Sequence, residues 1–282
     1  GPGIARTIAG LDIGVTICED AWQHCGATPN DYDSDPILHI VEWGRQGVVL
    51  DATVNLSASP YHADKSSIRV EVARSAAASL NHPFLLANQV GANDDLLIDG
   101  RSIIAWPDGT AVVAPSWTEG VLVADLFSPE SCEWLGDGDV TILSPGEELT
   151  SSDDDLLDAV IIGLSDYCRK SGISKIVLGL SGGIDSALAA CVASAAVGAE
   201  NVTAISMPSR HSSQHSIDDA KATAEALGIN FSIQPISDLH ISAESALKET
   251  LANGNPVAAE NLQARLRGLI VMAHANANGA MA

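Results

Sequence analysis

The stretch Ile176-Val-Leu-Gly-Leu-Ser181-Gly-Gly-Ile-Asp185-Ser186 contains a short apolar run, a glycine-rich turn and the start of an alanine-rich segment. The apolar run predicts a buried parallel strand, and the alanine-rich segment predicts a helix. The turn is therefore expected at a helix N-terminus, where free N–H groups and the helix dipole favour an anion. Gly182 and Gly183 carry no Cβ, so the backbone can come close to a phosphate.

The polar side chains of this turn fit a phosphate and a cation. Ser181 and Ser186 supply hydroxyl donors, and Asp185 would repel a phosphate unless Mg²⁺ lay between them. The turn lacks the G-x-x-x-x-G-K-[ST] pattern of a Walker loop. It resembles the pyrophosphate loop of the ATP pyrophosphatases, which split ATP between its α and β phosphates. The resemblance implies Mg²⁺ at Asp185 and ATP binding by Gly179, Leu180, Ser181, Gly182, Gly183, Ile184, Asp185, Ser186 and Met207.

Strands and helices alternate on both sides of this turn. We expect strands at residues 175–180, 202–206 and 230–235, and helices at 187–197, 216–227 and 261–277. This alternation predicts an α/β domain with a doubly wound parallel sheet, Rossmann-like and of the adenine-nucleotide hydrolase type that the resemblance implies. Ligands of such sheets bind at the carboxyl ends of the strands, where the Ser181 turn lies.

A second pattern, Ile13-Gly-Val-Thr-Ile-Cys18-Glu19-Asp20-Ala-Trp22, places a cysteine at the end of a predicted buried strand. A strand end is rigid and opens to a cleft, which suits a nucleophile, although free cysteines are also among the most buried residues. The pattern resembles the nucleophile strand of the nitrilase superfamily in its glutaminase version, and the resemblance continues around Ser59 and Lys65. It implies the C-terminal part of an αββα sandwich, with Cys18 as catalytic nucleophile and glutamine bound by Glu19, Ser59 and Lys65.

The two families in this order resemble the glutamine-dependent NAD synthetase family. This resemblance implies a carbon–nitrogen ligase that adenylates deamido-NAD with ATP and amidates it with ammonia released from glutamine, giving NAD, AMP and pyrophosphate. It also implies Arg210 at the phosphate or adenylate, Asn261 and Arg265 at deamido-NAD, and a homo-oligomer. Two alternatives remain: another glutamine-dependent pyrophosphate-loop ligase, and a non-catalytic fragment that retains nucleotide binding.

The nitrilase mechanism uses a Glu–Lys–Cys triad whose Glu and Lys precede the cysteine strand by a long way, and only 17 residues precede Cys18 here. Neither partner can be assigned, so we expect an internal fragment that does not hydrolyse glutamine alone. We expect a partial glutaminase domain at 1–125, a linker rich in Asp, Glu, Gly, Ser and Pro at 126–150, and a partial NAD synthetase domain at 151–282.

Composition narrows the remaining possibilities. The 282 residues have a formal net charge of −22, which argues against a nucleic-acid partner. No apolar run is long enough to cross a bilayer, so we expect no membrane partner. The five cysteines show no C-x-x-C spacing, which favours reduced thiols and a cytoplasmic location. The partners that the resemblance implies are glutamine, ATP and deamido-NAD.

Overall fold

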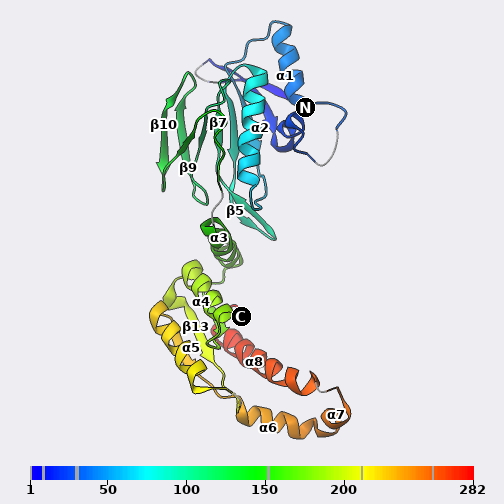
Figure 1. The fold of residues 1–282 in the computed structure, drawn as a ribbon, viewed down its shortest axis with the longest axis vertical. Helices are drawn as coiled ribbons and strands as arrows, with labels where there is room; N and C mark the ends of the chain where they lie inside the picture. Colours follow the sequence, from blue (N-terminus) through cyan, green and yellow to red (C-terminus); the bar gives the residue numbers. More distant parts are fainter. Residues whose placement is uncertain (1, 8–9, 29–31, 151–152, 211, 256) are drawn as a thin grey trace. The chain divides into compact units, whose positions relative to one another are not determined.

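The computed structural model describes residues 2–7, 10–28, 32–150, 153–210, 212–255 and 257–282, and the chain forms two compact units (Figure 1). Unit 1 is Gly1–Ala159 and unit 2 is Val160–Ala282. The division falls within helix α3, Asp153–Ser171.

The centre of unit 1 is a seven-stranded mixed sheet in the order β1-β2-β3-β4-β7-β8-β11. Strands β2, β3 and β4 are parallel to one another, so their carboxyl ends lie at one edge of the sheet. The other neighbours pair antiparallel, and the strands β5 and β6 form a separate small hairpin. The bounds are Gly3–Arg6 (β1), Asp12–Ile17 (β2), Ala52–Ser57 (β3), Phe84–Asn88 (β4), Val90–Asn93 (β5), Leu96–Asp99 (β6), Ile103–Ala105 (β7), Ala111–Val113 (β8) and Thr141–Leu143 (β11).

Different elements cover the two faces of this sheet. Helix α2 (Lys65–Leu80), which packs beside α1 (Pro36–Arg45), buries Val72, Ala73 and Ala76 against side chains from the strands such as Phe84. On the other face, the hairpin of β9 (Gly120–Asp125) and β10 (Ser128–Gly136) packs against the cluster around Trp106. Figure 1 shows α2 and this hairpin on opposite sides of the sheet. Two short 3-10 helices, η1 (Cys18–Ala21) and η2 (Gln23–Cys25), follow β2.

The segment 126–150, expected as a linker, differs from that expectation. It contains β10 and β11, and β11 pairs with β8 to complete the large sheet. The hairpin strands alternate exposed and half-buried residues, because they lie at the surface of unit 1. Their polar and glycine-rich composition therefore reflects surface strands and turns as well as a connection.

Unit 2 contains a three-stranded parallel sheet in the order β12-β13-β14. Alternate strand residues face opposite sides: Ile176 and Ala204 pack in a cluster with α4 and α5, whereas Val177 and Ile205 pack with α8. Helices thus cover both faces. The bounds are Ile176–Gly179 (β12), Ile184–Val197 (α4), Ala199–Asn201 (η3), Val202–Ser206 (β13), Gln214–Leu227 (α5), Asn230–Ile233 (β14), Ser237–Ala246 (α6), Lys248–Asn253 (α7) and Val257–Asn278 (α8).

This arrangement confirms the predicted α/β class and the parallel sheet of the second region. The strands and helices expected at 175–180, 187–197, 202–206, 216–227, 230–235 and 261–277 are all present, with ends that differ by a few residues. Helices α6 and α7 were not predicted. None of the helices in the described part of the chain has the length and apolar composition needed to span a bilayer.

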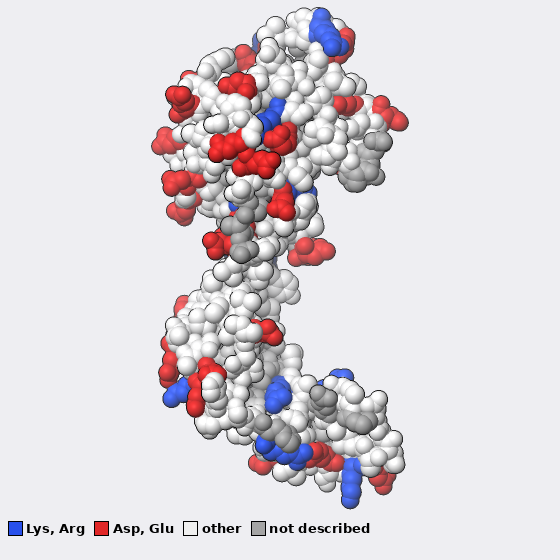
Figure 2. Space-filling view, in the orientation of Figure 1, with Lys and Arg blue, Asp and Glu red and all other residues white. Residues whose placement is uncertain are grey.

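The negative net charge of the chain comes almost entirely from unit 1. Residues 1–159 contain 6 Lys and Arg against 26 Asp and Glu, whereas residues 160–282 contain 8 against 10. Figure 2 shows the same contrast on one face: acidic side chains dominate unit 1, and both signs are interspersed over unit 2. The predicted phosphate turn therefore lies in the unit that repels an anion least.

Candidate functional site

Cys18 lies in a cavity of about 350 Å³ at the carboxyl ends of the parallel strands β2 and β3. Strand β2 ends at Ile17, η1 begins at Cys18, and the chain after β3 brings Ser59 to the same place. The four residues predicted from the nitrilase resemblance are all in the cavity wall. The lining residues are Cys18, Glu19, Trp22, Ala27, Thr28, Ser59, Pro60, His62, Lys65 and Ile68.

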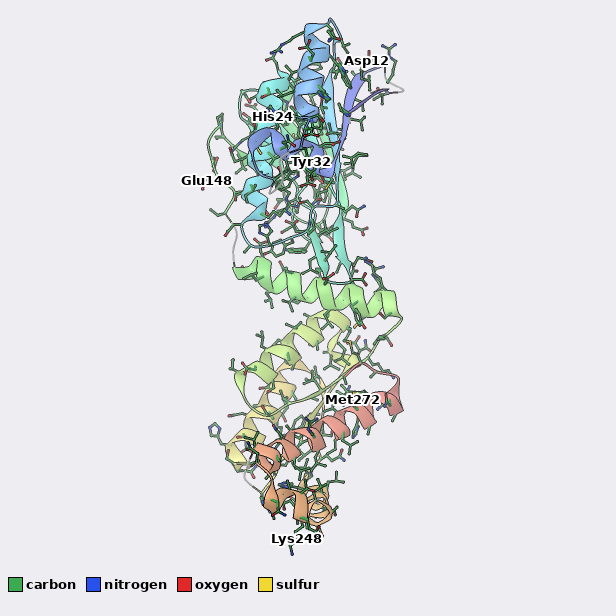
Figure 3. All side chains as sticks on the ribbon, turned by 90° about the vertical axis from the view of Figure 1, so that its right-hand side faces the viewer. Asp12, His24, Tyr32, Glu148, Lys248 and Met272 are labelled. Carbon is green, nitrogen blue, oxygen red and sulfur yellow. The ribbon has the colours of Figure 1, made fainter. Side chains whose placement is uncertain are left out.

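Among the described residues that line the cavity, Glu19 and Lys65 carry opposite charges. Tyr32, labelled in Figure 3, donates a hydrogen bond from its hydroxyl to Glu19 Oε2 at 2.9 Å. Lys65 Nζ lies 5.1 Å from the ring centroid of Trp22, within the range of a cation–π contact. Burial lowers the pKa of Lys65, and the nearby positive charge of Arg69 lowers it further. The opposite charges of Glu19 and Lys65 suit a zwitterionic ligand.

Ser59 adds an unused polar group to this cavity. Its side chain is buried, and Ser59 Oγ has no hydrogen-bond partner among the described residues. Its backbone N–H donates to Asn88 Oδ1 at 2.9 Å, and Asn88 Nδ2 donates to the carbonyl of Gly100 at 2.8 Å. Asn88 thus has a structural role, and the Ser59 hydroxyl is left for a ligand.

A fully buried ion pair stands one turn along α2 from Lys65. Arg69 Nη2 binds Asp99 Oδ2, and Ser66 Oγ donates to the same carboxylate oxygen at 3.1 Å. Both charged side chains have no exposed surface. Arg101 also donates to Ser66 Oγ, at 2.8 Å, so this polar cluster joins α2 to the end of β6 and the residues that follow it. The charge of Arg69 is held close to Lys65 by this pair.

A second cavity, of about 370 Å³, lies within unit 2 at the carboxyl ends of β12 and β13. It brings together four of the nine residues predicted to bind ATP: Gly179, Leu180, Ser181 and Met207. The other lining residues are Ile205, Ser206, Pro208, Ser212, Ser216, Ile217, Arg267, Gly268 and Val271. The remaining predicted residues, 182–186, form the turn and the beginning of α4 beside Ser181.

The glycine turn is closely packed against the first residues of α5. Gly182 has φ +82°, and a Cβ there would lie 2.3 Å from the carbonyl oxygen of Ser216. The hydroxyl of Ser186 donates to the carbonyl of Gly183 at 2.9 Å and accepts from the N–H of Ser181 at 3.2 Å. Position 182 therefore favours glycine, and the close packing places Ser181 and the first turn of α5 at one cavity.

The residues predicted to bind the adenylate or deamido-NAD do not line this cavity. Arg210 forms an ion pair with Glu244 of α6, with Nη2 and Oε1 2.7 Å apart. Asn261 and Arg265 are exposed on α8. Arg267 lines the cavity instead and donates from Nε to the carbonyl of Met207 at 3.1 Å. Sequence reasoning also missed Ser212 and Ser216, whose position depends on how α5 packs.

Asp185, the predicted metal ligand, lies in the first turn of α4. Across the described residues, no group of three His, Cys, Asp or Glu side chains is placed to hold a metal ion. Mg²⁺ usually keeps several waters and takes one or two carboxylates together with substrate phosphates. A single carboxylate in the first turn of α4 fits that ligand set when a nucleotide supplies the phosphates.

Known families match both regions of the chain. Residues 4–134 match the carbon-nitrogen hydrolase family, and residues 156–282 match the NAD synthase family. The protein is thus an α/β chain that joins a nitrilase-like region to an NAD synthase region. Over nearly its whole length the chain is similar to glutamine-dependent NAD(+) synthetases.

Three relatives illustrate the similarity. The glutamine-dependent NAD(+) synthetase of Synechocystis sp. is 40% identical over 276 residues, which cover 95% of this chain and 47% of the relative. The Rhodobacter capsulatus enzyme is 38% identical over 271 residues, covering 95% and 45%. The structure of the Acinetobacter baumannii enzyme in complex with ADP has a TM-score of 0.77 at 28% identity, covering 99% of this chain and 49% of that one. The chain spans about half the length of the curated relatives that it matches.

Proposed function

We propose that this chain takes part in glutamine-dependent NAD synthesis, with a glutamine site in unit 1 and an ATP site in unit 2. The observation that carries the proposal is the presence, in one chain, of the Cys18 cavity and the Ser181 cavity. In the overall reaction, ATP adenylates the nicotinate carboxylate of deamido-NAD. Ammonia from glutamine then displaces AMP, giving NAD, AMP and pyrophosphate.

In unit 1, the Cys18 thiolate would attack the side-chain amide carbon of glutamine and release ammonia. Glu19 would accept a hydrogen bond from the α-ammonium group, while Lys65 and Ser59 would bind the α-carboxylate. The support is the pair of opposite charges and the unpartnered hydroxyl in one cavity. We propose that unit 1 is the C-terminal part of a nitrilase-like αββα sandwich, in which the triad Glu and Lys would come from the longer protein.

In unit 2, the Ser181 turn and the N-termini of α4 and α5 would hold the phosphates of ATP, beside Met207. Asp185 would ligate Mg²⁺, which would offset the negative charge of the phosphates. The similar Acinetobacter baumannii enzyme was solved in complex with ADP, which supports adenine-nucleotide binding by this chain. We propose a doubly wound domain of the adenine-nucleotide hydrolase type, since helices cover both faces of its parallel sheet.

The remaining predicted residues of unit 2 stay part of this proposal. Asn261 and Arg265 would contact deamido-NAD, and Arg210 would stabilise phosphate charge once it leaves Glu244. We also propose a homo-oligomer. Leu269, one turn beyond Arg265, is 59% exposed, so an exposed apolar side chain accompanies the predicted substrate residues on this face of α8. A cytoplasmic location remains a proposal from the five free cysteines.

Calorimetric titration of the chain with Mg²⁺–ADP and with L-glutamine tests the proposal and its alternatives. We expect both ligands to bind, each with the same affinity in the presence of the other. Asp185→Asn should weaken ADP binding in Mg²⁺ but not in EDTA, and Cys18→Ala should leave ADP binding unchanged. Binding of ADP alone would favour the non-catalytic nucleotide-binding alternative, and binding of neither would refute the function.

The chain should not release ammonia from glutamine by itself. The 17 residues before Cys18 contain only Arg6 and Asp12 as ionisable side chains, and these two bind each other with Nη2 and Oδ2 2.5 Å apart. No general base is thus supplied from that segment. The measurement is ammonia release by the chain compared with its Cys18→Ala variant. A clear rate that depends on Cys18 would show that another residue acts as the base.

A further inference from the structure

The backbone of Cys18 adopts an uncommon conformation. Its φ angle is +45°, in the left-handed region that residues with a Cβ rarely occupy. The direction of the thiol depends on this conformation, because the Cβ leaves the backbone where β2 ends and η1 begins. Such strained positions persist only where surrounding groups hold them.

Two polar side chains hold this turn from opposite sides. Asp20 Oδ2 accepts the N–H of Ile17 at 2.9 Å, just before the cysteine. Asn55 Nδ2 donates to the carbonyl of Cys18 at 3.1 Å and to Thr16 Oγ1 at 3.0 Å. Asn55 is fully buried on the neighbouring strand β3, so water does not compete for these bonds.

The orientation of the Asn55 amide is set by its neighbours. The carbonyl of Cys18 can only accept, so it takes the Nδ2 side of the amide, and Ser57 Oγ then donates to Asn55 Oδ1 at 2.5 Å. Thr16 Oγ1 uses its own proton toward the carbonyl of Val54 at 3.4 Å, so it must accept from Asn55. Both contacts direct the NH₂ group toward Cys18, and Ser57 acts as the orienting group.

We propose that Asn55, oriented by Ser57, is a positioning residue that holds the Cys18 carbonyl and thereby the direction of the thiol. The inference rests on the proposed function insofar as Cys18 is the nucleophile. Asn55 does not belong to the described residues that line the cavity. Its loss should therefore change the reaction of the thiol and leave ligand affinity almost unchanged.

The probe is a chloromethyl ketone analogue of glutamine, in which CH₂Cl replaces the amide NH₂. The Cys18 thiolate attacks the CH₂ carbon, a C–S bond forms, and the C–Cl bond breaks with loss of chloride. All variants are labelled at the same alkaline pH, because the thiolate is the form of a cysteine that reacts. Mass spectrometry of the peptide that contains Cys18 gives the maximal rate of labelling and the half-saturating concentration separately.

We expect Ser57→Ala and Asn55→Leu to lower the maximal labelling rate roughly threefold to tenfold, the factor corresponding to one net hydrogen bond. The half-saturating concentration should stay within about twofold. Thr53→Val is the matched control, because Thr53 is buried on the same strand and its hydroxyl contacts His82 rather than Cys18. Ser57→Ala, the smaller change, keeps the test valid if Asn55→Leu does not fold.

An unchanged labelling rate in Ser57→Ala and in folded Asn55→Leu would overturn the inference, as would an equal loss in Thr53→Val. If the analogue does not label the unaltered chain, the proposed glutamine site fails. The iodoacetamide rate of Cys18, divided by that of the exposed Cys191 in unit 2, then decides the positioning role. A ratio that changes in the Ser57 and Asn55 variants but not in Thr53→Val supports that role, and any other result overturns it.

Discussion

The substitution Gly182→Ala tests the geometry of the glycine turn most directly. At φ +82° an alanine is strained by about 1–2 kcal/mol. Its Cβ would also lie 2.3 Å from the carbonyl oxygen of Ser216, a backbone atom that can move away only if the start of α5 moves. Overpacking of this kind costs about 1–3 kcal/mol, so we expect unit 2 to lose about 2–5 kcal/mol of unfolding free energy.

Gly228→Ala separates the two effects. Gly228 has φ +68°, and a Cβ there would meet nothing within 4 Å. This variant should lose only the backbone strain, about 1–2 kcal/mol. The entropy that alanine removes from the unfolded chain is common to both variants. The difference between their unfolding free energies therefore measures the contact with Ser216.

Urea unfolding can follow the two units separately. All five tryptophans precede residue 160, so their fluorescence reports unit 1, whereas far-ultraviolet circular dichroism also reports the helices of unit 2. Gly182→Ala should shift the circular dichroism transition and leave the fluorescence transition unchanged. A loss no larger than that of Gly228→Ala would refute the close approach of the turn to α5.

Three further outcomes follow from the two cavities. In Gly183→Ala the new Cβ would lie 3.4 Å from the nearest side chain, so the unfolding free energy should change by less than about 1 kcal/mol. ADP binding should nevertheless weaken in a titration, and an unchanged affinity would contradict a phosphate at that backbone. Because burial lowers the pKa of Lys65, the chain should bind glutamine below that pKa and lose affinity as the pH rises through it. Calorimetry should show a smaller loss of affinity with pH for Lys65→Arg, and parallel pH curves for the two proteins would exclude this role. Asp99→Asn should lower the unfolding free energy by about 3–5 kcal/mol in the fluorescence transition, since Arg69 would stay buried without its partner, and a loss below about 1 kcal/mol would show that water reaches the pair.

Local pattern predicted the parallel strands and their turns well. Strands β2, β12 and β13 are short, mainly apolar runs followed by small or polar residues, and the structure places them as expected. This works because a strand covered on both faces is rich in apolar residues, while a turn with positive φ favours glycine. The same reasoning located the two cavities, because both lie at the carboxyl ends of parallel strands.

The hairpin β9–β10 had no comparable signal. Val121 and Leu135 are paired across its strands, and both are more than half exposed. Neighbouring Glu and Asp residues made this stretch resemble a connection. What holds the hairpin is its contact with the distant Trp106, whose indole N–H donates to the carbonyl of Leu126 at 2.9 Å. A pairing that depends on the far face of another sheet leaves little trace in local composition.

Helix α8 shows why some predicted binding residues fell outside the cavity. Val271, one turn beyond Arg267, packs toward the sheet, so Arg267 shares the face of α8 that lines the Ser181 cavity. Arg265 instead shares a face with the exposed Leu269 and with Met272, labelled in Figure 3. Helical spacing predicts which residues share a face, but only packing decides which face meets the sheet. The two faces of this helix therefore differ: Arg267 lines the Ser181 cavity, whereas Asn261 and Arg265 are exposed.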